Sequence, residues 1–242
     1  MKKNYLHPLS LIAIFILSSF IAQAQDFDDG VTLKLGLVNN LGDFGEVNHA
    51  DRDYDYNNGI SSISHNGSGA GISFEWGKYW YFNGIDLGND MAVGLDVSFI
   101  EFNFAVSNHT AAYSELGYYN ETDFNIFHLY VGPKVGPMFS YSPISELTLD
   151  ASLKFQILAG SLFGAYDMEY SDGYTETEGV IGYGLGFRFT PGVYVRYRQF
   201  LAGIEFNLGS TNGSAAYSAT DESSSGSMPT SNAKLAIGFK FN

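Results

Sequence analysis

The chain has 242 residues, which suits one all-β domain, and it has no cysteine, which excludes disulfides, thiolate metal sites and a cysteine-linked lipid anchor. Its 26 acidic residues outnumber 12 basic ones, which excludes nucleic acid as a partner, because such binding depends on neutralising phosphates. Charged residues make up only 16% of the chain, compared with about 25% in soluble proteins.

The first residues predict an export signal. Two lysines precede an apolar run from Leu9 to Ala22, and an Ala-Gln-Ala cleavage pattern ends at Ala24. We expect residues 1–24 to be a signal peptide and residues 25–242 to form an outer-membrane β-barrel domain. A retained helical anchor is the alternative, although the apolar run is short for a span of about 20 residues.

Eight segments of the mature chain alternate apolar and polar residues with a period of two, which indicates β-strands. The third segment changes the parity of its apolar residues near Ile100, which predicts a β-bulge. The segments lie at residues 31–38, 70–82, 91–105, 124–141, 147–160, 181–197, 200–209 and 233–242.

The connections between these segments alternate in length. Short ones follow the second, fourth and sixth segments, and long ones occupy residues 39–69, 106–123, 161–180 and 210–232. This rhythm predicts an eight-stranded antiparallel up-and-down transmembrane β-barrel in the bacterial outer membrane, with long extracellular loops and short periplasmic turns. A wide porin is excluded, because eight strands leave no aqueous channel.

The polar side of the segments is predicted to face the lumen. Gly182, Gly184 and Gly186 share this side. A narrow lumen barely holds side chains, so small residues there make room for a few large ones. A soluble, lipocalin-like ligand barrel is the alternative. Lys234 also projects to the polar side. The predicted lumen charge network comprises Lys34, Glu75, Asp96, Lys134, Asp150, Lys154, Arg188, Arg196, Glu205 and Lys240.

The apolar side is predicted to face lipid. Lys78 is an exception, and its side chain can extend to the lipid headgroups, where tryptophan and tyrosine also gather. The predicted aromatic girdle comprises Trp76, Trp80, Tyr141, Tyr197, Phe239 and Phe241.

The stretch 130–155 carries a Gly132-Pro-Lys-Val-Gly strand, a Ser142-Pro-Ile-Ser turn and a Leu149-Asp-Ala strand. It resembles the central strand-turn-strand of Bacteroidota outer-membrane β-barrel domain proteins, the PorT-like and OmpX-like group. The resemblance implies a monomeric barrel inserted by the barrel-assembly machinery, although such barrels often end on an aromatic residue and this chain ends on Asn242.

The long loops hold 15 acidic residues and a single basic one, Arg52. Divalent cations bridging the loops to lipopolysaccharide are one interpretation, and a solvated, repulsive surface is the other. Tyrosines in the same loops favour recognition of a protein or glycan ligand. The predicted recognition residues are Asp51, Asp53, Asp55, Tyr54 and Tyr56.

For catalysis the candidates are His128, pointing inward, with His109 and Ser107 nearby. A lone inward histidine is more often a hydrogen-bonded lumen residue, so we expect no enzyme, no cofactor and no metal site. We therefore predict a structural or surface-recognition role. The alternatives are an accessory component of protein secretion or envelope biogenesis, and a lipid-modifying outer-membrane hydrolase.

Overall fold

The computed structural model describes residues 27–40, 47–48, 59–65, 69–85, 87–115, 118–169, 173–217 and 223–242. The predicted signal peptide lies outside these residues. Within the described part of the chain, no helix has the length and apolar character needed to cross a membrane. The strands are β1 (Gly30–Asn40), β2 (Val47–Asn48), β3 (Gly59–His65), β4 (Ala70–Tyr81), β5 (Met91–Glu115), β6 (Tyr118–Ile144), β7 (Leu147–Glu169), β8 (Thr175–Tyr197), β9 (Phe200–Tyr217), β10 (Ser223–Pro229) and β11 (Asn232–Phe241).

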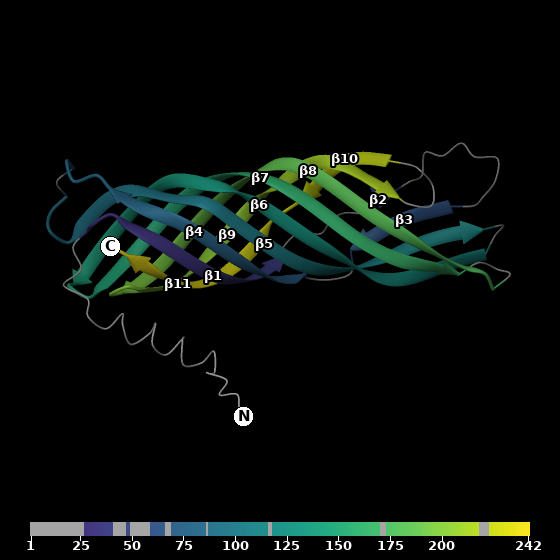
Figure 1. Ribbon diagram of the computed structural model, residues 1–242, viewed down its shortest axis with the longest axis horizontal. Helices are drawn as coiled ribbons and strands as arrows, with labels where there is room; N and C mark the ends of the chain where they lie inside the picture. The colour runs from purple at the N-terminus through teal and green to yellow at the C-terminus, as the bar shows by residue number, and fades with distance from the viewer. Residues whose placement is uncertain are drawn as a thin grey trace, which may run out of the picture.

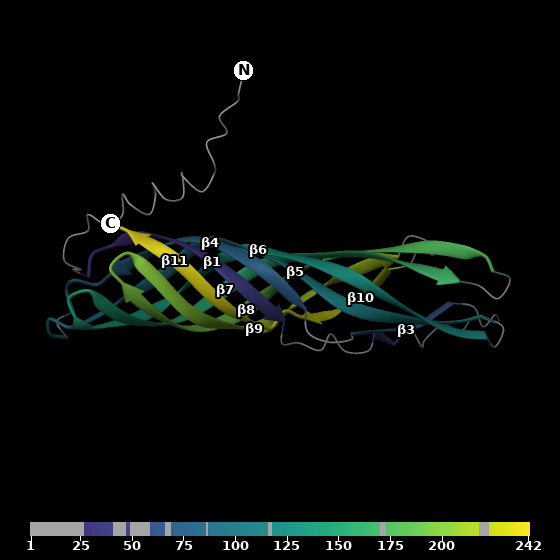
Figure 2. The same cartoon turned by 90° about the horizontal axis from the view of Figure 1, so that it is seen from below.

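Eight strands of the described chain close into an elongated antiparallel barrel (Figures 1 and 2). From β1 the ring runs through β4, β5, β6, β7, β8, β9 and β11, and pairing of β11 with β1 closes it. The short strands β2, β3 and β10 lie outside this ring, with β3 paired to the outer part of β5 and β10 to that of β9. The predicted eight-stranded up-and-down barrel is therefore confirmed.

The predicted bulge in β5 is also present. Trp76 pairs with Ile100, whereas the next residue of β4 pairs with Ser98, so Phe99 has no partner on that strand. The extra residue changes which side chains face inward. As a result Ser98 and Glu101 are both buried, while Phe99 is exposed on the outside.

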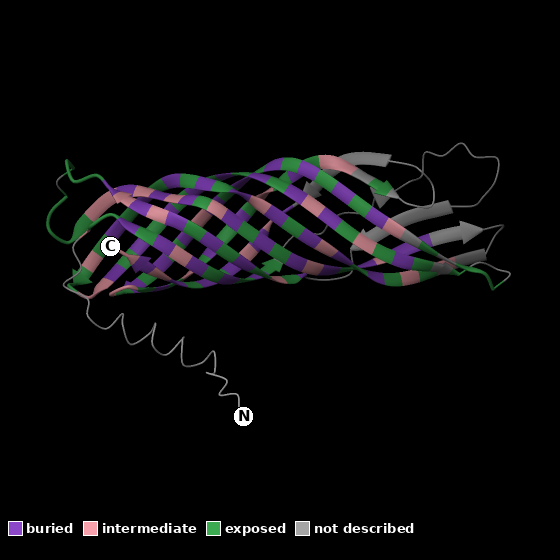
Figure 3. Cartoon of the chain, viewed as in Figure 1, coloured by how far each residue is buried: buried purple, intermediate pink, exposed green. Residues whose placement is uncertain are grey.

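In the half of each barrel strand that lies nearer the short turns, exposed and buried residues alternate (Figure 3). The outward side chains are large and apolar: 65% of Leu37 and 63% of Ile237 are exposed, and Phe74 is exposed beside them. All the basic residues predicted to face the lumen are buried. Strands cross a bilayer in this inverted arrangement. The closed ring pairs the polar backbone groups of every strand with those of its neighbours, and the apolar exterior contacts the hydrocarbon of the lipid tails. The chain is an outer-membrane barrel, and a soluble lipocalin-like barrel is excluded.

Four strands are much longer than the membrane requires. β5, β6, β7 and β8 have 25, 27, 23 and 23 residues, whereas a tilted strand crosses the bilayer in about 9–11 residues. Paired strands therefore occupy most of 106–123 and 161–180, where the sequence predicted loops, and β9 and β10 occupy much of 210–232.

The alternation reverses its sense in these outer hairpins. On β6, Asp123 and Asn125 face outward, whereas Phe124 and Ile126 are buried inside. Water, not lipid, surrounds this part of the barrel, so polar residues are favoured outside and apolar ones inside. The reversal explains why the predicted strands were too short. The residues still alternate, but in the outer hairpins polar residues face outward and apolar residues face inward.

The short turns that link β6 to β7 and β8 to β9 are tied to one another. Nη2 of Arg198, in the β8–β9 turn, donates a hydrogen bond of 2.7 Å to Glu146, in the β6–β7 turn. This hydrogen bond lowers the pKa of the Glu146 carboxyl below its ordinary value.

Candidate functional site

A layer of buried charges crosses the middle of the lumen. Strand alternation turns each of these side chains inward, and seven of the eight barrel strands contribute at least one. We call this group the ionic layer. Its members are Lys34 on β1, Glu75 on β4, Asp96 and Glu101 on β5, Lys134 on β6, Lys154 on β7, Glu205 on β9 and Lys234 on β11.

The four lysines and four carboxylates of the ionic layer form an interlocked set. Each lysine lies within 4.0 Å of three carboxylates. Glu75 and Glu205 contact all four lysines, with Lys154 at 2.6 Å from Glu205 and Lys234 at 2.7 Å from Glu75. Burying ions is costly unless each is paired, and here the numbers of opposite charges match.

Neutral groups complete the hydrogen bonding of the carboxylates. Ser98 donates to Glu75 at 2.7 Å, and Tyr194, on β8, donates to Glu205 at 2.5 Å. The amide of Gln156 donates to Glu101 at 3.1 Å. Through Tyr194, β8 joins the layer as well, so every strand of the ring is connected to it.

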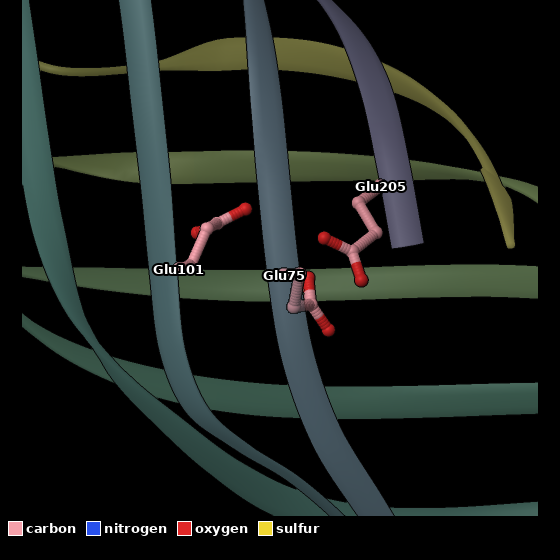
Figure 4. A group of neighbouring side chains, drawn as sticks. All are labelled: Glu75, Glu101 and Glu205. Carbon is pink, nitrogen blue, oxygen red and sulfur yellow. The ribbon is translucent and has the colours of Figure 1, made fainter. Parts of the chain in front are cut away.

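Three carboxylates of the layer lie close enough to suggest a metal site. Figure 4 shows Glu75, Glu101 and Glu205 gathered inside the barrel, and one oxygen of each lies within 4.8 Å of the others. Lysine ammonium groups already contact all three carboxylates. A divalent cation would have to approach these ammonium groups closely, so the arrangement fits an ion-pair network better than a metal site.

Two predicted members of the charge network form a separate pair nearer the short turns. Nε of Arg196 lies 3.1 Å from Asp150, and its Nη2 donates to the hydroxyl of Tyr81 at 3.0 Å. Asp150 also accepts a hydrogen bond of 2.5 Å from Ser140. Lys240 belongs to neither group, and its Nζ donates to the side chain of Asn242 at 2.7 Å.

Arg188 lies on the outer side of the ionic layer. Its Nε donates to Oγ1 of Thr230 at 2.9 Å, and its guanidinium carbon lies 4.5 Å from the centre of the Tyr130 ring. It is buried but forms no ion pair with any described carboxylate. The predicted network thus divides into the ionic layer, the Arg196–Asp150 pair, and isolated cations on either side.

The three catalytic candidates lie together, further outward. Oγ of Ser107 lies 2.6 Å from Nε2 of His128 and 2.8 Å from Nε2 of His109. One imidazole must accept the hydroxyl proton while the other donates its own. All three side chains are buried within the barrel. The chain of contacts continues from Nδ1 of His128 to the hydroxyl of Tyr130 at 3.4 Å.

The predicted girdle residues lie on the outer surface. Trp76, Tyr141 and Tyr197 are exposed, and Trp80, Phe239 and Phe241 are partly exposed. Nζ of Lys78 lies 3.5 Å from Asp29 and 5.2 Å from the centre of the Trp80 ring. The predicted recognition residues Asp51, Asp53, Asp55, Tyr54 and Tyr56 lie outside the described part of the chain.

The prediction omitted Glu101 from the charge network. The parity change at Ile100 was the signal that could have found it, because that change turns residue 101 inward. In the structure Glu101 lies 2.8 Å from both Lys134 and Lys234.

No family model matches this chain, and no curated protein matches it in sequence. Solved structures that are similar include the outer membrane protease OmpT from Escherichia coli, at 11% identity and a TM-score of 0.44, covering 92% of this chain and 99% of that one. The outer membrane protein OprG from Pseudomonas aeruginosa has 10% identity and a TM-score of 0.43, with 91% and 99% covered. The attachment invasion locus protein Ail of Yersinia pestis has 13% identity and a TM-score of 0.26, with 90% and 100% covered. At these identities and TM-scores, the assignment of the fold rests on the strand pairing of this chain, and no activity of the similar proteins is transferred to it.

Proposed function

We propose that this chain is a closed, non-conducting outer-membrane barrel that holds a rigid recognition surface outside the membrane. The ionic layer is the observation that carries the proposal, because its charges come from seven strands and meet across the lumen. Nearer the outside, the buried side chains of Phe124, Ile126 and Leu162 occupy the lumen of the hairpins. Both features support a lumen that is plugged against solutes.

The outer hairpins supply the recognition surface in this proposal. Their outward carboxylates are exposed at Glu121, Asp123, Asp167 and Glu169. Two of them are fixed by hydrogen bonds of 2.6 Å from threonines of the neighbouring strands, to Asp123 and to Asp167. A paired strand loses less conformational entropy on binding than a free loop does. The chemistry suits a cationic segment of a partner protein.

Planar-bilayer recording of the refolded full-length chain tests the plugged lumen. The expected result is the absence of a steady conductance, and a large, steady current would contradict the proposal.

A shortened hairpin tests recognition. Replacing residues 110–123 with Asn-Gly joins His109 and Phe124, which already pair across the hairpin. Vesicles carrying this variant should bind less poly-lysine than wild-type vesicles, while heat-modifiable gel migration stays unchanged. Equal binding by both proteins would leave only the structural role.

The proposal includes the absence of enzymatic activity. Ser107 and His128 lie in hydrogen-bond range, which favours a hydrolase, but both are buried inside the barrel. A lipid substrate would reach the opposite, outer surface. Expression of the wild-type chain should therefore leave the mass of lipid A unchanged, and a mass change abolished by His128→Ala would establish the hydrolase instead. Loss of exported cargo on deletion of the gene would favour the secretion component.

A further inference from the structure

Arg188 is a buried cation of the lumen that forms no ion pair with any described carboxylate. Arg188 is 1% exposed, and its Nη1 and Nη2 atoms donate to no described group. Its position follows from pairing with Gln156, which lies two residues outward of Lys154 on β7. The guanidinium therefore lies just outside the ionic layer, with two hydrogen-bond donors unused.

Charge balance inside the barrel isolates Arg188 further. The four lysines of the ionic layer face four carboxylates, and Arg196 is neutralised by Asp150. Glu101 interacts electrostatically with Arg188, but it is already paired with Lys134 and Lys234, each at 2.8 Å. On the outer side of the ionic layer, Arg188 thus adds one positive charge that no described carboxylate pairs with. A buried charge without a partner is strongly unfavourable.

A second unsatisfied donor lies on the strand residue that pairs with Tyr130. The side-chain amide of Asn103 is buried, and both its nitrogen and its oxygen have no partner among the described groups. Asn103 pairs across the strands with Tyr130, whose ring contacts Arg188. The unused donors of Arg188 and Asn103 therefore both lie next to Tyr130.

Side chains pack closely around the Tyr130 ring. Gly160 lies against the Tyr130 ring so closely that a Cβ atom there would come within 2.8 Å of it. Leu158 and Leu162, which flank Gly160 along β7, are buried and apolar. A water molecule could accept these hydrogen bonds but would not balance the charge. A monatomic anion does both, whereas a phosphate group needs more room.

We propose that Arg188 binds one small inorganic anion, chloride, inside the lumen, with the amide of Asn103 as a further donor. The anion would neutralise the charge of Arg188, just as the four carboxylates of the ionic layer neutralise its four lysines. Because it binds the folded barrel and not the unfolded chain, it would stabilise the fold in proportion to its occupancy.

The test compares thermal unfolding of the full-length chain in sodium bromide and in sodium gluconate at equal ionic strength. Gluconate is too large for the site, so bromide should raise the unfolding midpoint of the wild type. Arg188→Gln should abolish this shift. Arg198→Gln, an equivalent change in an exposed periplasmic turn, should retain it.

Asn103→Asp provides a variant that keeps the arginine. The new carboxylate would serve as an internal counterion, so this protein should fold and lose the bromide shift, even if Arg188→Gln does not fold. Crystals grown in bromide should give an anomalous peak beside Nη1 or Nη2 in the wild type and none there in Asn103→Asp. A wild type with no bromide shift, a full shift in Asn103→Asp, or a wild-type crystal without the peak would each overturn the proposal.

Discussion

Replacing Glu75 with glutamine should destabilise the barrel strongly. The wild-type carboxylate contacts the ammonium groups of Lys34, Lys134, Lys154 and Lys234 at 2.8, 3.4, 3.2 and 2.7 Å. Glutamine keeps the shape but removes one charge, which leaves four buried lysines facing three carboxylates. Removing one partner of a buried ion pair costs about 3–5 kcal/mol. The ratio of folded to unfolded protein should fall roughly 100- to 4,000-fold.

Urea titration of the chain in lipid vesicles measures this effect. Tryptophan fluorescence reports insertion, because both tryptophans, Trp76 and Trp80, lie on the outer surface of β4. The matched control is Glu146→Gln, which makes the same chemical change in an exposed periplasmic ion pair, where such pairs contribute little. A Glu75→Gln midpoint equal to that of the control would refute the idea that the ionic layer stabilises the barrel.

A compensating change separates charge from shape. Adding Lys154→Met to Glu75→Gln leaves three lysines and three carboxylates in the layer. The double variant should therefore be less destabilised than the sum of the two single variants, by about 0.5–3 kcal/mol. Strict additivity would mean that the layer acts through packing and not through charge.

Further predictions concern the outer face, the lumen and the turns. Leu235→Arg, on the lipid side, should cost about 2–4 kcal/mol in the urea titration if that side contacts the bilayer, and almost nothing if it contacts water. Gly160→Val should reduce the folded fraction on heat-modifiable gels, because its side chain would collide with the neighbouring ring, whereas Gly84→Ala, in an open turn, should have no effect. In an NMR titration the Glu146 carboxyl should protonate at a lower pH than an ordinary glutamate, and Arg198→Gln should raise that pH.

Much of the barrel could be predicted from the sequence, because the membrane enforces a strict pattern on its strands. A lipid-facing position requires an apolar side chain, and strand geometry turns its neighbours inward. Parity alone therefore places Lys34, Glu75 and Arg188 on the polar side, and all three side chains are buried in the structure. The bulge at Phe99 was visible for the same reason.

The outer hairpins could not be predicted in this way, because the solvent around the barrel changes. Beyond Phe127, water replaces lipid, and the apolar side of β6 becomes the inner side at Ile126 and Phe124. A pattern search that expects one sign of alternation ends at that point. The division of the charges into groups could not be predicted either, since it depends on how far each side chain reaches across the lumen. Lys134 reaches Glu205, whereas Arg188 pairs with no carboxylate in the described part of the chain.

The ionic layer also explains how eight similar strands keep one register. A slip of a single residue exchanges the two faces of a strand. In β7, for example, it would turn Lys154 toward the lipid and Phe155 toward the lumen, and the carboxylates of Glu75 and Glu205 would lose a partner at the same time. If the apolar exterior were the only constraint, such a slip would cost free energy only at the residues of the displaced strand. Because the ionic layer joins every strand to charges on several others, a slip anywhere leaves buried ions unpaired across the barrel, and the penalty falls on the whole ring.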